Sequence, residues 1–130
     1  MTELTQAQID AFWNDGVLTL PDAISADQLN RLRLDFNTWV TESHTKTASY
    51  GDTFDGRPRF DLQPGDGHKA AALRRVQAPA EVSDVYYEVM SSSRMTQMVA
   101  DLIGPNVKHH HNKINSKQPG SDTQVKWHQD

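Results

Sequence analysis

The sequence contains no cysteine among its 130 residues. This absence excludes a disulfide framework and any metal site built on thiolates, so a bound metal would need histidine and carboxylate ligands. It also fits a reducing compartment, where proteins are not stabilised by disulfides.

Two further absences narrow the function. No apolar run approaches the roughly 18 residues of a membrane span, and the start at Met1 lacks the basic and then apolar segments of a signal peptide. There is no basic excess either, because 13 Lys and Arg stand against 17 Asp and Glu, with a net charge of -4. We therefore expect a cytoplasmic protein without membrane or nucleic-acid partners. Nothing in the sequence indicates an oligomeric state.

What is present predicts one domain with helices at its start. Two capping boxes mark helix beginnings, one at Thr5 and one at Ser25. The first helix is expected over residues 6–15 and ends at Gly16. The apolar run 17–20 predicts a short strand, so the chain up to residue 44 is interpreted as helix, strand, helix. Four large side chains at helical spacing are expected in the core: Trp13, Trp39, Met95 and Met98.

The middle of the chain contains two segments with different predicted structure. Residues 45–78 are rich in Gly, Asp, Thr and Pro and predict a loop-rich region with one strand at 59–62. Residues 79–104 predict two helices, the first opened by Pro79 and the second ended by Gly104.

The last part, residues 105–130, predicts strands over 107–116 and 125–130. The second strand carries His128 and Asp130, and side chains two residues apart on a strand leave the same face. An imidazole and a carboxylate placed in this way can converge on one ion. They would supply two of the three ligands of a 2-His-1-carboxylate Fe(II) site.

The segment from His109 to Gly120, followed by Trp127-His128-Gln129-Asp130, resembles the phytanoyl-CoA dioxygenase family of Fe(II)/2-oxoglutarate oxygenases. Two upstream stretches are also similar to that family, Leu4 to Pro21 and Leu102 to Asn106. The resemblance covers nearly the whole chain, but only the N-terminal half of the family's length.

The resemblance implies an α+β fold in which a double-stranded β-helix, or jelly roll, has an N-terminal helical cover. The chain would end after the first barrel strands. The implied enzyme is a dioxygenase that hydroxylates a small substrate with O2 and decarboxylates 2-oxoglutarate to succinate. His128 and Asp130 would hold Fe(II), while Arg75 and Lys113 would contact 2-oxoglutarate. The family's distal His and its 2-oxoglutarate-binding Arg would lie beyond residue 130.

Other interpretations stay open at this stage. The chain could be a non-catalytic binding module or an inactive fragment of such an oxygenase. The run His109-His110-His111 alternates faces on a strand, so at most two of its side chains can converge on a ligand. Four aspartates in the Gly-rich region match no calcium-loop spacing and are interpreted as turn formers: Asp52, Asp55, Asp61 and Asp66.

Overall fold

The computed structural model describes residues 2–129. The elements follow in the order α1 (Gln6–Asp15), α2 (Ala26–Ser43), β1 (Tyr50–Asp52), β2 (Pro58–Gln63), β3 (Ala72–Gln77), a 3-10 helix η1 (Pro79–Glu81), α3 (Asp84–Ser92), α4 (Arg94–Ile103) and β4 (Lys113–Asn115).

The first two helices begin where the capping boxes predict. The Thr5 and Ser25 side chains each accept a hydrogen bond from the backbone N–H three residues later, and a Gln side chain accepts in return from the cap N–H. α1 ends at Gly16, whose φ of 75° places it in the left-handed region that glycine adopts without steric cost.

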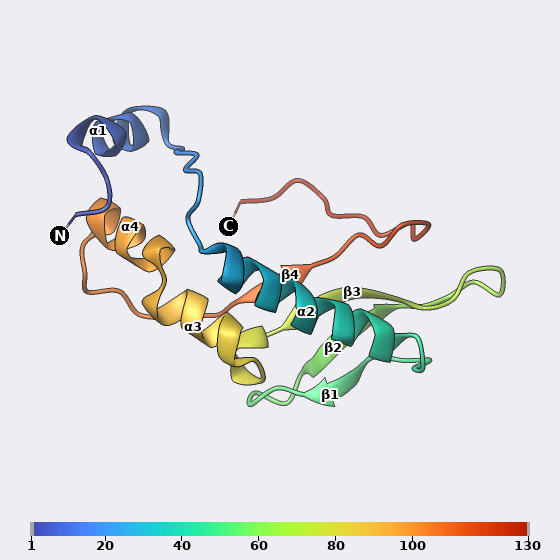
Figure 1. Cartoon of the computed structure of the whole chain (residues 1–130). Coiled ribbons are helices and arrows are strands. Elements are labelled where there is room, and N and C mark those ends of the chain that lie inside the picture. Colours follow the sequence, from blue (N-terminus) through green and yellow to red (C-terminus); the bar gives the residue numbers. More distant parts are fainter. Residues whose placement is uncertain (1, 130) are drawn as a thin grey trace.

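The four strands form one antiparallel sheet in the order β1-β2-β3-β4. α2 crosses one face of this sheet (Figure 1). Trp39 of α2 packs there against Phe60, and Leu73 and Val76 of β3 complete the centre of this core with almost no exposure. Burying such apolar area is the main stabilising contribution of the fold.

Two predicted core residues are exposed. Trp13 is 64% exposed and Met95 is 38% exposed, whereas Trp39 and Met98 are buried as predicted. α1 buries none of its residues because its main packing partner is α4 alone, and Trp13 packs edge-on against its neighbour Phe12.

Three strand predictions are wrong in extent. Residues 17–20 form no strand, because no other strand lies beside them. Only Lys113–Asn115 of the range 107–116 is a strand, where β3 pairs with it. Residues 125–129 are irregular, and Asp130 lies outside the described residues.

The region interpreted as loop-rich contains three strands. β2 includes the predicted strand at 59–62, and β1 and β3 flank it as sheet neighbours. β2 and β3 are joined by the loop 64–71, in which Gly65 lies so close to the Lys69 carbonyl that a Cβ would stand 2.1 Å from that oxygen. Only a residue without a side chain fits there.

The two helices predicted after this region are present with one change. Pro79 opens a 3-10 turn, and the α-helix starts five residues later with the Ser83 hydroxyl as its cap. α4 then runs to Ile103 and ends at Gly104, as predicted.

A jelly roll requires a second sheet, and residues 2–129 form a single sheet of four strands. The jelly roll therefore stays a prediction. None of the helices in the described part of the chain has the length and apolar content to cross a membrane.

Candidate functional site

A groove of about 410 Å³ lies where β3 and β4 meet the C-terminal segment. Three of the four predicted site residues line it together: Arg75 from β3, Lys113 from β4 and His128 from the C-terminal segment. The fourth, Asp130, lies outside the described residues. Residues separated by 53 positions in the sequence thus share one groove.

A β-bulge determines which side chains β3 presents to this groove. Asp61 of β2 pairs with Arg75, but the next residue, Leu62, pairs with Leu73, so Arg74 is an extra residue in β3. Leu73 and Val76 both reach the core although they are three positions apart. The two arginines between them are both available to the groove.

Asp61 lies next to both arginines. Its Oδ2 is 3.7 Å from Arg74 Nε and 4.0 Å from an Arg75 terminal nitrogen. All three side chains are between 31% and 40% exposed, so these ion pairs add little to stability. Their effect is to hold two guanidinium groups near one another.

Across the next strand, Arg75 lies directly opposite Asn115, and Arg75 Nε donates a 3.3 Å hydrogen bond to Asn115 Oδ1. Two positions further along the ladder, Gln77 pairs with Lys113. A polar row therefore crosses β2, β3 and β4, and it consists of Asp61, Arg75 and Asn115. The same strand register places Lys113 beside the groove.

His128 enters the groove from an irregular segment. Its Nδ1 lies 2.7 Å from the Lys126 carbonyl oxygen, which can only accept a hydrogen bond. Nδ1 is therefore the donor in this arrangement, which in a neutral imidazole puts the lone pair on Nε2, a common metal-binding atom of histidine. This hydrogen bond orients the His128 ring although residue 128 does not belong to a regular strand.

The donor types suit Fe(II), because imidazole and carboxylate are its usual protein ligands. The number of donors does not suffice within residues 2–129, where no group of three or more His, Asp or Glu side chains is arranged to hold a metal ion. The described part of the chain thus contributes one predicted ligand, His128.

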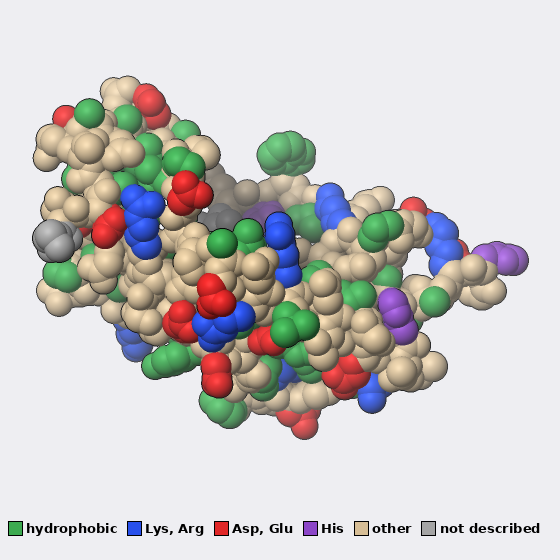
Figure 2. All heavy atoms as spheres, in the orientation of Figure 1, with side chains coloured by type: hydrophobic (Ala, Val, Ile, Leu, Met, Phe, Trp, Pro, Cys, Tyr) green, Lys and Arg blue, Asp and Glu red, His purple; other side chains and the backbone are tan. Residues whose placement is uncertain are grey.

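The groove is strongly cationic. Four of its lining side chains are formally positive, namely Arg74, Arg75, Lys113 and Lys126, and none of its lining residues is acidic. This contrasts with the face that carries α2, where Lys and Arg lie beside Asp and Glu (Figure 2), as in the pair of Arg31 with Glu88. The chain as a whole is acidic, so the groove is a local reversal of charge.

Sequence reasoning missed Arg74, Asn115 and Lys126. The spacing Leu73-Arg74-Arg75-Val76 breaks the two-residue alternation of a strand, and that break was the available signal for a bulge with both arginines on one side. No comparable signal marks Lys126, because its position depends on how the irregular segment 117–129 folds back.

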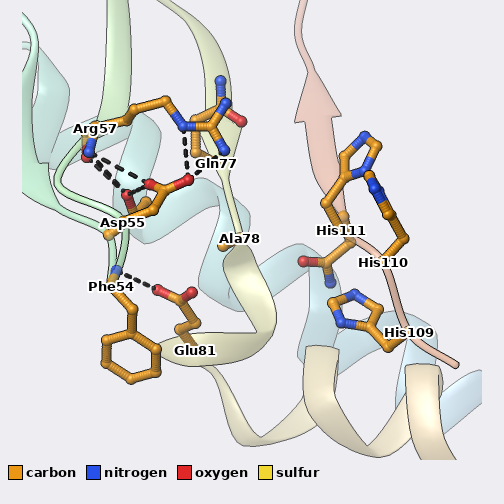
Figure 3. A pocket seen from close by; sticks show the side chains of 11 residues that line it. Phe54, Asp55, Arg57, Gln77, Ala78, Glu81, His109, His110 and His111 are labelled. Atoms are coloured by element: carbon orange, nitrogen blue, oxygen red, sulfur yellow. Dashed lines mark hydrogen bonds and ion pairs between the residues drawn. The ribbon is translucent and has the colours of Figure 1, made fainter.

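A second cavity, of about 380 Å³, holds the histidine run. His109, His110 and His111 face Asp55 and Glu81 across it (Figure 3). Both carboxylates have other partners. Hydrogen bonds from Arg57 and Thr53 lower the pKa of Asp55, and Glu81 pairs at 2.6 Å with the buried Arg59. Nothing in this cavity completes a three-ligand metal site within the described residues.

The chain can be compared with known proteins. Over 71 residues the chain is 31% identical to the "Probable alpha-ketoglutarate-dependent hypophosphite dioxygenase" of Stutzerimonas stutzeri. The match covers 55% of this chain and 24% of that protein, so the chain spans about a quarter of the relative's length. The similarity indicates a distant, partial relationship to 2-oxoglutarate oxygenases, 2-oxoglutarate being another name for alpha-ketoglutarate. No protein-family model matches the chain, and no solved structure matches it.

Proposed function

We propose that the protein is an Fe(II)/2-oxoglutarate-dependent dioxygenase of the phytanoyl-CoA dioxygenase type. It would oxidise a small-molecule substrate with O2 while 2-oxoglutarate is decarboxylated to succinate. The observation that carries the proposal is the shared groove of Arg75, Lys113 and His128, three residues that the family resemblance selects independently of any structure. The partial similarity to an alpha-ketoglutarate-dependent dioxygenase supports the same reaction class.

In this proposal Arg75 and Lys113 bind the carboxylates of 2-oxoglutarate. Charge-assisted hydrogen bonds from a guanidinium or an ammonium to a carboxylate are about twice as strong as neutral ones. Arg75 is suited to a defined pose, because Asp61 and Asn115 contact its guanidinium from both neighbouring strands.

His128 of this groove would hold the metal together with Asp130 and a further ligand, both from outside the described residues. Fe(II), when bound, supplies the redox chemistry that activates O2. The role of the chain itself is to orient 2-oxoglutarate, to present the His128 imidazole in one tautomer and to keep the carboxylates of the co-substrate neutralised.

The Stutzerimonas relative is named for hypophosphite, a small anion, and a cationic groove would suit such a substrate as well as an organic one. A jelly-roll barrel around the groove is part of the proposal.

The test is succinate formation from 2-oxoglutarate by the protein at its full natural length, supplied with Fe(II) and O2. His128→Ala and Asp130→Ala should each abolish it, since each removes one metal ligand. His68→Ala is the matched control, because His68 lies exposed in the loop 64–71, away from the groove. Near-normal turnover in both ligand variants would refute the assignment.

The rival function is a non-catalytic binding module. It is favoured by one observation, the lack of a three-ligand metal group within residues 2–129. A wild-type protein that forms no succinate but still binds 2-oxoglutarate would support this rival.

A further inference from the structure

The starting observation is an imbalance of charge in the groove. Within residues 2–129, the carboxylate paired with its cationic lining residues is that of Asp61, which lies 3.7 Å from Arg74 and 4.0 Å from Arg75. Bound 2-oxoglutarate would add two negative charges. Asp130 would add a third negative charge and bound Fe(II) two positive charges, so two positive charges would remain without compensation.

The uncompensated positive charge belongs to two side chains of the groove. Arg75 and Lys113 are assigned to 2-oxoglutarate, so Arg74 and Lys126 are the cationic side chains left over. The bulge places Arg74 next to Arg75, and Lys126 lies two residues before His128 on the segment that closes the groove. Both are thus near the reacting centre without being needed by the co-substrate.

The ion pair of Arg74 is a weak one. Among residues 2–129, its carboxylate partner is Asp61 at 3.7 Å, which it shares with Arg75 and which is partly exposed to water. A guanidinium has five N–H donors, which match the geometry of an oxyanion far better than one long, shared ion pair does. Like charges held close together also repel one another, and an anion between them relieves that repulsion.

We propose that the groove binds a second anion beside 2-oxoglutarate, so that the substrate carries an oxyanionic group that Arg74 and Lys126 bind. This inference rests on the proposed function for the role of the second anion as substrate. The oxyanionic group can be a carboxylate or a tetrahedral oxyanion. Both accept hydrogen bonds from the Arg74 guanidinium and the Lys126 ammonium through negatively charged oxygens.

The test measures binding without turnover. The full-length protein is loaded with Fe(II) in the absence of oxygen and saturated with 2-oxoglutarate, and sulfate or acetate is then titrated by calorimetry. Sulfate represents the tetrahedral dianion and acetate the carboxylate. We expect one of them to bind to the complex that already contains 2-oxoglutarate.

Arg74→Ala and Lys126→Ala should each weaken this second binding at least tenfold and leave the affinity for 2-oxoglutarate within about twofold. Arg33→Ala, which removes an exposed charge from α2, is the matched control and should change neither affinity. This control separates a local effect from the effect of net charge.

Two results would overturn the inference: anions that bind only in competition with 2-oxoglutarate, or an unchanged anion affinity in Arg74→Ala and Lys126→Ala. Failure of the proposed function looks different, since the wild-type protein would then form no succinate, whether or not it bound 2-oxoglutarate. If anion binding still depended on Arg74 and Lys126 in that case, the anion site would stand without the enzyme assignment.

Discussion

Arg75 on β3 and Asn115 on β4 form a directly opposed cross-strand pair, joined by a 3.3 Å hydrogen bond from Arg75 Nε to Asn115 Oδ1. Asp61 lies on the other side of the same arginine, at 4.0 Å. The guanidinium is therefore held from two strands, which limits the orientations it can take before a ligand arrives. Pre-ordering of this kind lowers the entropic cost of binding.

The pair gives the first prediction. Asn115→Ala should raise the dissociation constant for 2-oxoglutarate about two- to tenfold, because a hydrogen bond of this type contributes about 0.5–1.5 kcal/mol. The effect should be smaller than that of removing Arg75 itself. Calorimetric titration measures both, and Asn30→Ala on α2 is the control. An effect as large as that of Arg75→Ala would mean that Asn115 contacts the ligand directly.

The second prediction concerns a buried ion pair at the other end of the sheet. The Arg59 guanidinium donates to three backbone carbonyls and pairs with Glu81 at 2.6 Å, and its side chain is 5% exposed. Arg59→Ala leaves all these acceptors unpaired, so it should lower the free energy of unfolding by about 3 kcal/mol.

The matched control is Arg57→Ala, whose ion pair with Asp55 is 63% exposed on the arginine side. Its loss should lower the free energy of unfolding far less than that of Arg59, because solvent screens an exposed ion pair. Urea denaturation of both variants gives the comparison. Equal losses of unfolding free energy in the two variants would show that burial does not make the Arg59 ion pair more important for stability than the Arg57 ion pair.

The third prediction separates the two capped helices. Ser25→Ala should lower the global free energy of unfolding by about 1 kcal/mol, because α2 carries Trp39 into the core. Thr5→Ala should instead increase local opening of α1, which buries no residue. Amide hydrogen exchange of residues 6–15, combined with denaturation, tests this. A global loss in Thr5→Ala equal to that in Ser25→Ala would contradict it.

The fourth prediction concerns association. Met95, Val99 and Ile103 follow one another at four-residue spacing along α4 and are 38%, 39% and 58% exposed. An exposed apolar stripe of this kind promotes association, as does the free edge of β4. The isolated 130-residue chain should therefore self-associate at micromolar concentration, and Val99→Glu should reduce this. Light scattering that shows a monodisperse wild-type monomer would refute the prediction.

Local signals in the sequence were sufficient for the helices. Capping boxes at Thr5 and Ser25 and the stop at Gly16 involve residues within one helical turn, so they can be interpreted without knowing the fold. Trp13 was misjudged because its burial depends on whether another element covers α1, which helical spacing cannot indicate.

Strands were harder to predict because they depend on partners. Residues 17–20 and 125–129 have strand-like composition but no strand beside them, whereas β1 and β3 form in a region that composition assigned to loops. In the candidate site, the resemblance selected Arg75 and Lys113. Arg74 and Lys126 were missed, because their positions result from a bulge and from an irregular segment.

The central claim is that the groove of Arg75, Lys113 and His128 binds 2-oxoglutarate. Its most direct test is calorimetric titration of 2-oxoglutarate into the full-length protein with Fe(II) and without oxygen. Arg75→Ala and Lys113→Ala should each weaken binding about ten- to a hundredfold, since a lost charged hydrogen bond costs about 1.5–3 kcal/mol. Arg33→Ala should bind as the wild type does. Unchanged affinity in both groove variants would contradict the account.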